Sequence, residues 1–220
     1  MKNINIDKLF EQIDAVIFDM DGTLIDSLYV WGDIDIEFLG NHGIGTPPED
    51  YGPNIAGMSF IQVAEYTKKR FELEESIEEI MDIWNRMAEA KYANEVEYKP
   101  GAEDFIKQCL SRGMKLGIAT SNSRYLVEKL LSRLNLDKYM DVVVTGDEVT
   151  NGKPAPDIYL HVAECLGVVP DRCLVFEDVP AGILAGKRAG MKVCAVRDNA
   201  SLDVDCVKRE LADYYIESYL

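Results

Sequence analysis

The sequence predicts an α/β fold in which helices cover both faces of a parallel sheet and an all-helical segment is inserted near the N-terminus. Two observations predict it. Short apolar runs alternate with amphipathic stretches over most of the 220 residues, and one long segment carries helical patterns alone. Strands that alternate with helices form parallel sheets, and their crossover connections are right-handed.

Six short apolar runs are the candidate strands, because runs of this length bounded by turn residues are typical of strands buried inside a sheet. The last of them is the weakest. Between the second run and the fifth, leucines at helical spacing, such as Leu126, Leu130 and Leu134, indicate amphipathic helices. We therefore expect a Rossmann-like core with strands at residues 15–18, 116–119, 142–144, 174–176, 193–196 and 214–216.

Residues 28–97 interrupt this alternation, because they contain no candidate strand. Apolar residues at helical spacing indicate helices instead, for example around Ile34 and Ile80. A segment of this length is near the lower size limit of a domain. We therefore expect a core formed by residues 1–27 and 98–220, with residues 28–97 as an inserted helical domain.

The charge of the chain restricts its partners. With 23 basic and 39 acidic residues the net charge is −16, so the surface repels nucleic acid and any phosphate site needs its own positive charge. No apolar run reaches the roughly 18 residues of a membrane span, and the N-terminal residues lack the apolar stretch of a signal peptide. Five scattered cysteines without a C-x-x-C pair indicate reduced, mostly buried thiols. We expect a cytoplasmic protein with neither nucleic-acid nor membrane partners.

Polar side chains follow four of the predicted strands at the point where each strand ends. In open α/β sheets, ligands bind outside the carboxyl ends of the strands. An unselected sheet would seldom place functional groups at four strand ends, so we expect one shared site. The residues are, in chain order, Asp19 and Asp21, then Thr120, Ser121 and Asn122, then Lys153, and last Glu177 and Asp178.

The four carboxylates of this set predict a metal site. Asp19, Asp21, Glu177 and Asp178 cannot all stay ionised at close quarters without a cation. Oxygen ligands favour a hard ion, and Mg²⁺ accepts a few carboxylates together with waters and a phosphate oxygen. Two alternatives are solvated loop acids, which would not explain the convergence, and glycoside hydrolysis, which would explain fewer of the residues.

The remaining residues of the set predict a phosphate site. Lys153 lies in a turn between glycine and proline and supplies a point charge. Thr120 and Ser121 offer hydroxyl and backbone N–H groups at a helix N-terminus, where anions bind readily; simple helix capping is the alternative. We expect Thr120, Ser121, Asn122 and Lys153 to bind the phosphate of a small-molecule ester.

Four segments of the chain resemble the signature motifs of the haloacid dehalogenase superfamily. They are DMDGTL at residues 19–24, TSN at 120–122, KPAPD at 153–157 and ED at 177–178. Their order and spacing also match, over essentially the whole core. The resemblance is strongest to the branch that holds β-phosphoglucomutase and many sugar-phosphate phosphatases. It implies that residues 28–97 form the helical cap of a catalytic core.

The resemblance implies a Mg²⁺-dependent phosphohydrolase that hydrolyses a phosphate monoester with four catalytic groups. Asp19 would be the nucleophile, forming an aspartyl-phosphate and also binding Mg²⁺. Asp21 would be the general acid and base, and its backbone carbonyl would touch the metal. Thr120 would hold the phosphoryl oxygens, and Lys153 would neutralise charge on nucleophile and phosphate.

The resemblance further implies that Asp178, with Glu177, anchors Mg²⁺ and that the cap excludes water and chooses the substrate. A small phosphorylated metabolite, such as a sugar phosphate, is the expected substrate. The oligomeric state stays open.

Two departures from the mutase pattern bear on the reaction. Phe60 follows the Gly57–Ser59 turn where the mutase has an arginine for a second phosphate, and Trp31 lies near the position of a mutase histidine. Both favour hydrolysis of a substrate with one phosphate. A phosphosugar mutase and a non-catalytic phosphate-binding regulatory module are the alternatives. A dehalogenase is disfavoured, because Asp21 would have no purpose there.

Overall fold

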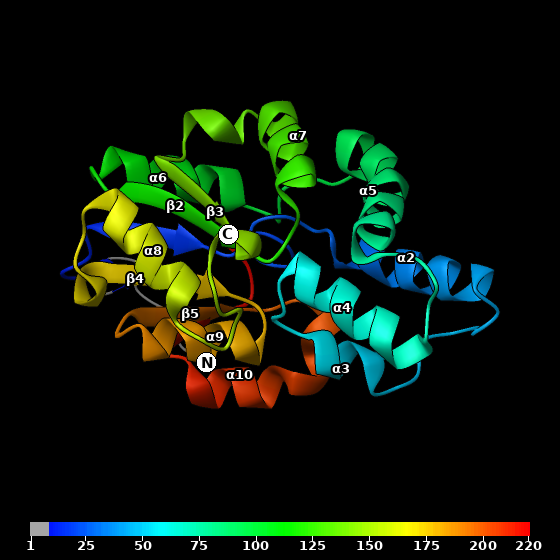
Figure 1. The fold of residues 1–220 in the computed structure, drawn as a ribbon. Coiled ribbons are helices and arrows are strands. Elements are labelled where there is room, and N and C mark those ends of the chain that lie inside the picture. The colour runs from blue at the N-terminus through cyan, green and yellow to red at the C-terminus, as the bar shows by residue number, and fades with distance from the viewer. Residues whose placement is uncertain (1–8) are drawn as a thin grey trace.

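The computed structural model describes residues 9–220 and has a central six-stranded sheet (Figure 1). All the strand pairs are parallel, in the order β3-β2-β1-β4-β5-β6. The predicted α/β class with a parallel sheet is therefore confirmed. The strands are β1 (Ala15–Phe18), β2 (Lys115–Thr120), β3 (Val142–Thr145), β4 (Cys173–Glu177), β5 (Lys192–Val196) and β6 (Tyr214–Ile216).

Helices cover both faces of the sheet, which is why its central strands are apolar throughout. In β1, Val16 and Phe18 belong to a core cluster with residues of α6 and α7, whereas Ala15 and Ile17 pack with residues of α8 and α9. Alternate residues of a strand point to opposite faces, so each face of β1 has its own core. The core helices are α6 (Ala102–Ser111), α7 (Arg124–Leu134), α8 (Asp157–Leu166), α9 (Pro180–Arg188) and α10 (Asp205–Leu211).

The strand order places the site. The chain runs outward from β1 through β2 to β3, and then returns to β4 on the other side of β1. Strand order reverses at this point, and ligands bind in the crevice that such a reversal opens at the carboxyl edge. Phe18 of β1 is in register with Phe176 of β4 and with Ile118 of β2. The residues that follow these three strands therefore emerge side by side.

The segment between β1 and α6 is helical and lies beyond one end of the sheet in Figure 1. Two of its helices begin with capping boxes, formed by Ser59 with Gln62 and by Ser76 with Glu79, in which side chain and backbone satisfy each other's hydrogen bonds. The exact limits of a separate domain remain a prediction. The helices are α2 (Leu28–Asn41), α3 (Tyr51–Ile55), α4 (Phe60–Phe71) and α5 (Ile77–Asn94).

Aromatic side chains form the core of these helices. Trp84 of α5 meets Phe38 of α2 and Phe60 of α4 edge to face, with ring centroids 5.5 and 5.7 Å apart. Trp31 meets Phe60 in the same way, at 5.7 Å. Edge-to-face pairs are favoured by the ring quadrupoles and fix the relative orientation of the helices. The helix α5 also packs against α7 and so joins this unit to the sheet.

Within residues 9–220, no helix combines the length and the apolarity that crossing a bilayer requires. Three of the five cysteines are buried, Cys109, Cys173 and Cys194, whereas Cys165 and Cys206 are exposed. The expectation that most cysteines are buried is therefore confirmed.

Candidate active site

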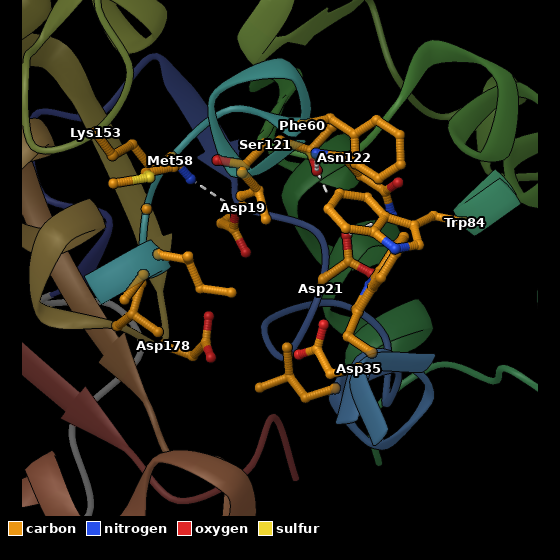
Figure 2. A pocket seen from close by; sticks show the side chains of 18 residues that line it. Asp19, Asp21, Asp35, Met58, Phe60, Trp84, Ser121, Asn122, Lys153 and Asp178 are labelled. Atoms are coloured by element: carbon orange, nitrogen blue, oxygen red, sulfur yellow. Dashed lines mark hydrogen bonds and ion pairs between the residues drawn. The ribbon is translucent and has the colours of Figure 1, made fainter. Parts of the chain in front are cut away.

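The predicted site residues converge on a cavity of about 250 Å³ between the carboxyl edge of the sheet and the helical segment (Figure 2). Only Glu177, of the predicted set, does not line this cavity, because it is fully buried behind Lys153. The sequence therefore predicted where the functional groups gather. Those that line the cavity are Asp19, Asp21, Thr120, Ser121, Asn122, Lys153 and Asp178.

A buried lysine joins two carboxylates at the floor of the cavity. Lys153 Nζ lies 2.6 Å from Asp19 Oδ1 and 2.6 Å from Glu177 Oε1, and it also donates to the carbonyl oxygen of Ala119 at 3.3 Å. Burial favours the neutral amine, but the charges of Asp19 and Glu177 outweigh it and raise the pKa of Lys153. The lysine is therefore a fixed positive charge beside Asp19.

Glu177 accepts hydrogen bonds at both of its oxygens. Its Oε1 accepts from Lys153 and from Tyr159 Oη, the latter at 2.7 Å, and its Oε2 accepts from the backbone N–H groups of Asp178 and Val179 at 3.0 and 3.4 Å. A Cβ on Gly182 would come within 1.7 Å of Glu177 Oε1, so the approach of α9 requires glycine at this position. Glu177 thus fixes both the lysine and the loop that carries Asp178.

One carboxylate oxygen of Asp178 accepts a hydrogen bond within residues 9–220 and the other does not. Thr23 Oγ1 donates to Oδ1 at 3.1 Å, whereas Oδ2 is buried without a hydrogen-bond partner in the part of the chain that the structure describes. Burial, followed by the charges of Asp19 and Glu177, raises the pKa of Asp178 well above its usual value. A Cβ on Gly22 would lie 2.4 Å from the unpartnered oxygen, so the backbone approaches closely here, at a φ of 79°.

These carboxylates suit a hard cation. Asp19, Glu177 and Asp178 each offer an oxygen within 4.8 Å of the others. Burial raises the pKa of Asp19 to about 7 even though Lys153 opposes the shift. Crowded, buried carboxylates with an unpartnered oxygen are stabilised by a divalent ion, and an all-oxygen donor set favours Mg²⁺ or a similar hard metal.

Asp21 faces away from that cluster and toward the helical segment. Its Oδ1 accepts from Ser27 Oγ at 2.6 Å and from the hydroxyl of Tyr92, and its Oδ2 accepts from Asn122 Nδ2 at 3.0 Å. Tyr92 Oη in turn accepts from Trp31 Nε1 at 2.9 Å. The Asp21 carboxylate is therefore held jointly by the core and by α2 and α5.

The end of β2 presents polar groups that helix capping does not use. The N-cap of α7 is Ser123, whose hydroxyl accepts from Leu126 N at 3.4 Å. Thr120 Oγ1 instead accepts from Asn122 N at 3.1 Å, and Thr120 and Ser121 both line the cavity. Capping is therefore not the explanation for Thr120 and Ser121.

Sequence reasoning missed three residues that organise the site: Ser27, Tyr92 and Tyr159. The position of Tyr92 continues the buried series Trp84 and Ala88 along α5, so the sequence indicated its burial but not its partner. Tyr159 is buried in α8 and reaches Glu177 only because β4 lies beside β1.

The family of the chain follows from comparison with known proteins. Residues 16–196 match the model of the haloacid dehalogenase-like hydrolases. A Thermotoga maritima protein named phosphorylated carbohydrates phosphatase is 34% identical over 180 residues, which cover 82% of this chain and 83% of the relative. Hexitol phosphatase B of Escherichia coli is 28% identical, with 84% of each chain covered. The crystal structure of a putative β-phosphoglucomutase from Thermotoga maritima superimposes with a TM-score of 0.71 at 31% identity, covering 94% of this chain and 95% of that one.

The chain belongs to the haloacid dehalogenase-like hydrolase family. Several of its relatives are named phosphatases, and it is a hydrolase that acts on phosphate esters.

Replacing Tyr92 by Phe tests whether its hydrogen bond orients the Asp21 carboxylate. The substitution removes one donor to Asp21 and leaves Trp31 Nε1 without its acceptor. We expect the free energy of unfolding to fall by about 1–3 kcal/mol, and kcat to fall by about ten- to a hundredfold because Asp21 is less well oriented. Denaturant unfolding and steady-state kinetics give both values. Tyr66→Phe is the control, and an unchanged kcat for Tyr92→Phe would contradict the role.

Proposed function

We propose that this protein is a Mg²⁺-dependent phosphomonoesterase that hydrolyses a small phosphorylated carbohydrate, or a similar metabolite, through an aspartyl-phosphate on Asp19. The buried pair of Asp19 and Lys153, beside a carboxylate cluster with an unpartnered oxygen, carries the proposal. Relatives named for phosphorylated carbohydrates and for hexitols support the substrate class.

In the first step, a carboxylate oxygen of Asp19 attacks phosphorus and the bond from phosphorus to the leaving oxygen breaks. The protonated carboxyl of Asp21 gives its proton to that oxygen, so the product leaves as a neutral alcohol. Lys153 opposes the negative charge that gathers on Asp19 and on the phosphoryl oxygens, and Thr120 donates to those oxygens. Asp19 Oδ1 is already fixed by Lys153, which limits the reorganisation that attack requires.

In the second step, the Asp21 carboxylate takes a proton from water as the water oxygen attacks phosphorus. The bond between phosphorus and Asp19 breaks, and inorganic phosphate leaves. Asp21 ends the cycle protonated and Asp19 ends it as a carboxylate, so the sum is ester plus water giving alcohol plus phosphate. Ser27, Asn122 and Tyr92 orient Asp21 for both transfers.

The metal belongs with Asp19 and Asp178. The unpartnered Oδ2 of Asp178 is the best available ligand, and Asp19 is the next. Glu177 lies within reach, but its oxygens already accept four hydrogen bonds, so we assign it to holding Lys153 in place. When bound, Mg²⁺ supplies positive charge to the phosphoryl group and to the crowded carboxylates.

Hydrolysis, rather than mutase action, is favoured by the lining of the cavity. A mutase must hold a second phosphate, which needs a second cation. Among the described residues that line the cavity, Lys153 is the one basic side chain, and Phe60 is a buried aromatic at the start of α4. We therefore propose that residues 28–97 act as a cap that shields the site from bulk water and accepts substrates with a single phosphate.

The nucleophile is tested by Asp19→Asn. An amide cannot form the acyl-phosphate, so we expect kcat to fall by about 10³-fold or more while the fold is kept. Phosphate release from a panel of sugar phosphates measures it. Asp26→Asn, an exposed acid on the segment that follows, is the control and should keep full activity. Activity above about one tenth of wild type in Asp19→Asn would sink the covalent mechanism.

The metal is tested by thermal unfolding as well as by turnover. We expect Mg²⁺ to raise Tm, since a ligand at one hundred times its Kd stabilises by about 2.7 kcal/mol, and we expect a chelator to abolish phosphate release. Asp178→Asn should lose the Tm response, because it removes the unpartnered carboxylate oxygen. Sodium chloride at matched ionic strength is the control. Full activity in excess chelator would rule the metal out.

Hydrolysis and mutase action are separated by one incubation. With β-glucose 1-phosphate and catalytic glucose 1,6-bisphosphate, we expect free phosphate as the main product, because residues 9–220 bring no second basic side chain to the cavity for a bisphosphate. Glucose 6-phosphate forming faster than free phosphate would show that the chain is a mutase.

A further inference from the structure

The cavity outside the phosphate site is apolar, with one exception. Its walls come from α2, from the end of α3 with the connection to α4, and from α4 and α5, and they are aliphatic and aromatic. Asp35 of α2 is the one charged side chain that these helices add, in the part of the chain that the structure describes. The apolar residues are Leu28, Trp31, Ile55, Met58, Phe60, Val63 and Trp84.

Asp35 is partly buried and has no partner of its own. No hydrogen bond or ion pair within residues 9–220 reaches its carboxylate, and burial alone raises its pKa to about 7. Figure 2 shows the carboxylate directed toward the cavity, across from Asp19 and Asp178. Its neighbours on the helix differ, because Asp33 pairs with Lys91 and Glu37 is exposed. Asp35 is thus the acidic residue of α2 whose carboxylate is positioned to contact a ligand in the cavity.

An unpartnered carboxylate in an apolar wall is costly, since burying a polar group without a hydrogen bond loses its hydration. A ligand that donates a hydrogen bond to this carboxylate replaces the hydration that burial removed. A ligand that carries a second anionic group adds electrostatic repulsion instead. The surrounding rings, Trp31, Phe60 and Trp84, suit the apolar face of a carbon skeleton. The same wall therefore attracts one class of leaving group and rejects another.

We propose that Asp35 is a specificity-determining residue, which accepts a hydrogen bond from a hydroxyl or ammonium group at the far end of the leaving group and excludes substrates that carry a second anionic group there. This inference rests on the proposed function and names its substrate class more closely: a neutral or cationic monophosphate, such as a polyol or amino-polyol phosphate. Phosphorylated sugar acids and bisphosphates are excluded.

Four esters of one carbon length test the proposal. They are sorbitol 6-phosphate, its 1-deoxy and 1-amino-1-deoxy analogues, and 6-phosphogluconate, which end in a hydroxyl, a methyl, an ammonium and a carboxylate. At pH 8, above the pKa of about 7 of Asp35, we expect kcat/KM of the wild type to be at least about tenfold higher for the hydroxyl and ammonium esters than for the carboxylate ester, with the methyl ester in between. The hydroxyl and ammonium arms distinguish the two donor types.

Two variants assign the preference to Asp35. Asp35→Asn removes the charge and should bring the carboxylate ester to within about threefold of the hydroxyl ester. Asp35→Leu removes the acceptor and should abolish the advantage of the hydroxyl ester over the methyl ester. Glu37→Gln, which removes an exposed charge from the same helix, is the control and should keep the wild-type order. Wild-type selectivity in both Asp35 variants would overturn the proposal.

Equilibrium binding separates this inference from the proposed function. Kd values of the four esters are measured by calorimetry with Mg²⁺ in an Asp19→Asn background, with and without Asp35→Asn. We expect the same order of selectivity in Kd as in kcat/KM. Failure of the wild type to release phosphate, with the Asp35-dependent order kept in Kd, would refute the phosphatase and leave the inference standing. Phosphate release by the wild type, with an order of Kd values that does not depend on Asp35, would refute the role of Asp35 and leave the proposed phosphatase activity standing.

Discussion

The ammonium of Lys153 is the interaction on which the site depends. It lies 2.6 Å from oxygens of both Asp19 and Glu177, and all three groups are buried. Breaking a buried ion pair by removing one partner costs about 3–5 kcal/mol, because the other charge is left uncompensated. The sheet order makes the arrangement possible, since β1 and β4 are neighbours and the loop before α8 reaches across their ends. The buried charge of Lys153, whose removal would leave Asp19 and Glu177 uncompensated, is therefore the charge that the proposed phosphoryl transfer uses.

The helical segment lines the cavity and also supplies a hydrogen-bond donor to Asp21. Asp21 follows β1, yet its donors include Ser27 next to α2, Tyr92 on α5 and Asn122 after β2. The position of Asp21 is thus coupled to the packing of α5 against the core. In our proposal Asp21 moves the protons, so Tyr92 of the helical segment helps to orient the acid–base group, and Asp35 selects the leaving group.

The sequence predicted the sheet and most of the polar side chains that gather at the cavity. Each observed strand contains the predicted apolar run and extends beyond it by at most one residue at each end, as in Lys115–Thr120, because most of the added end residues are polar and hydrophobicity does not report them. The helix α3 was not predicted, since Gly52 and Pro53 within it are turn residues by composition. Tyr92 and Asp35 were missed for another reason. Periodicity tells which helix face is buried, but only tertiary packing tells what that face meets.

The central claim is a covalent phosphoryl group on Asp19, and chemical trapping tests it most directly. The enzyme is mixed with a sugar phosphate and Mg²⁺, quenched during turnover and reduced with borohydride, which converts an aspartyl-phosphate into homoserine. Peptide mass spectrometry then locates the reduced residue. The account predicts homoserine at position 19, dependent on substrate and lost in Asp19→Asn. Rapid phosphate release with an unmodified Asp19 in every quenched sample would contradict it.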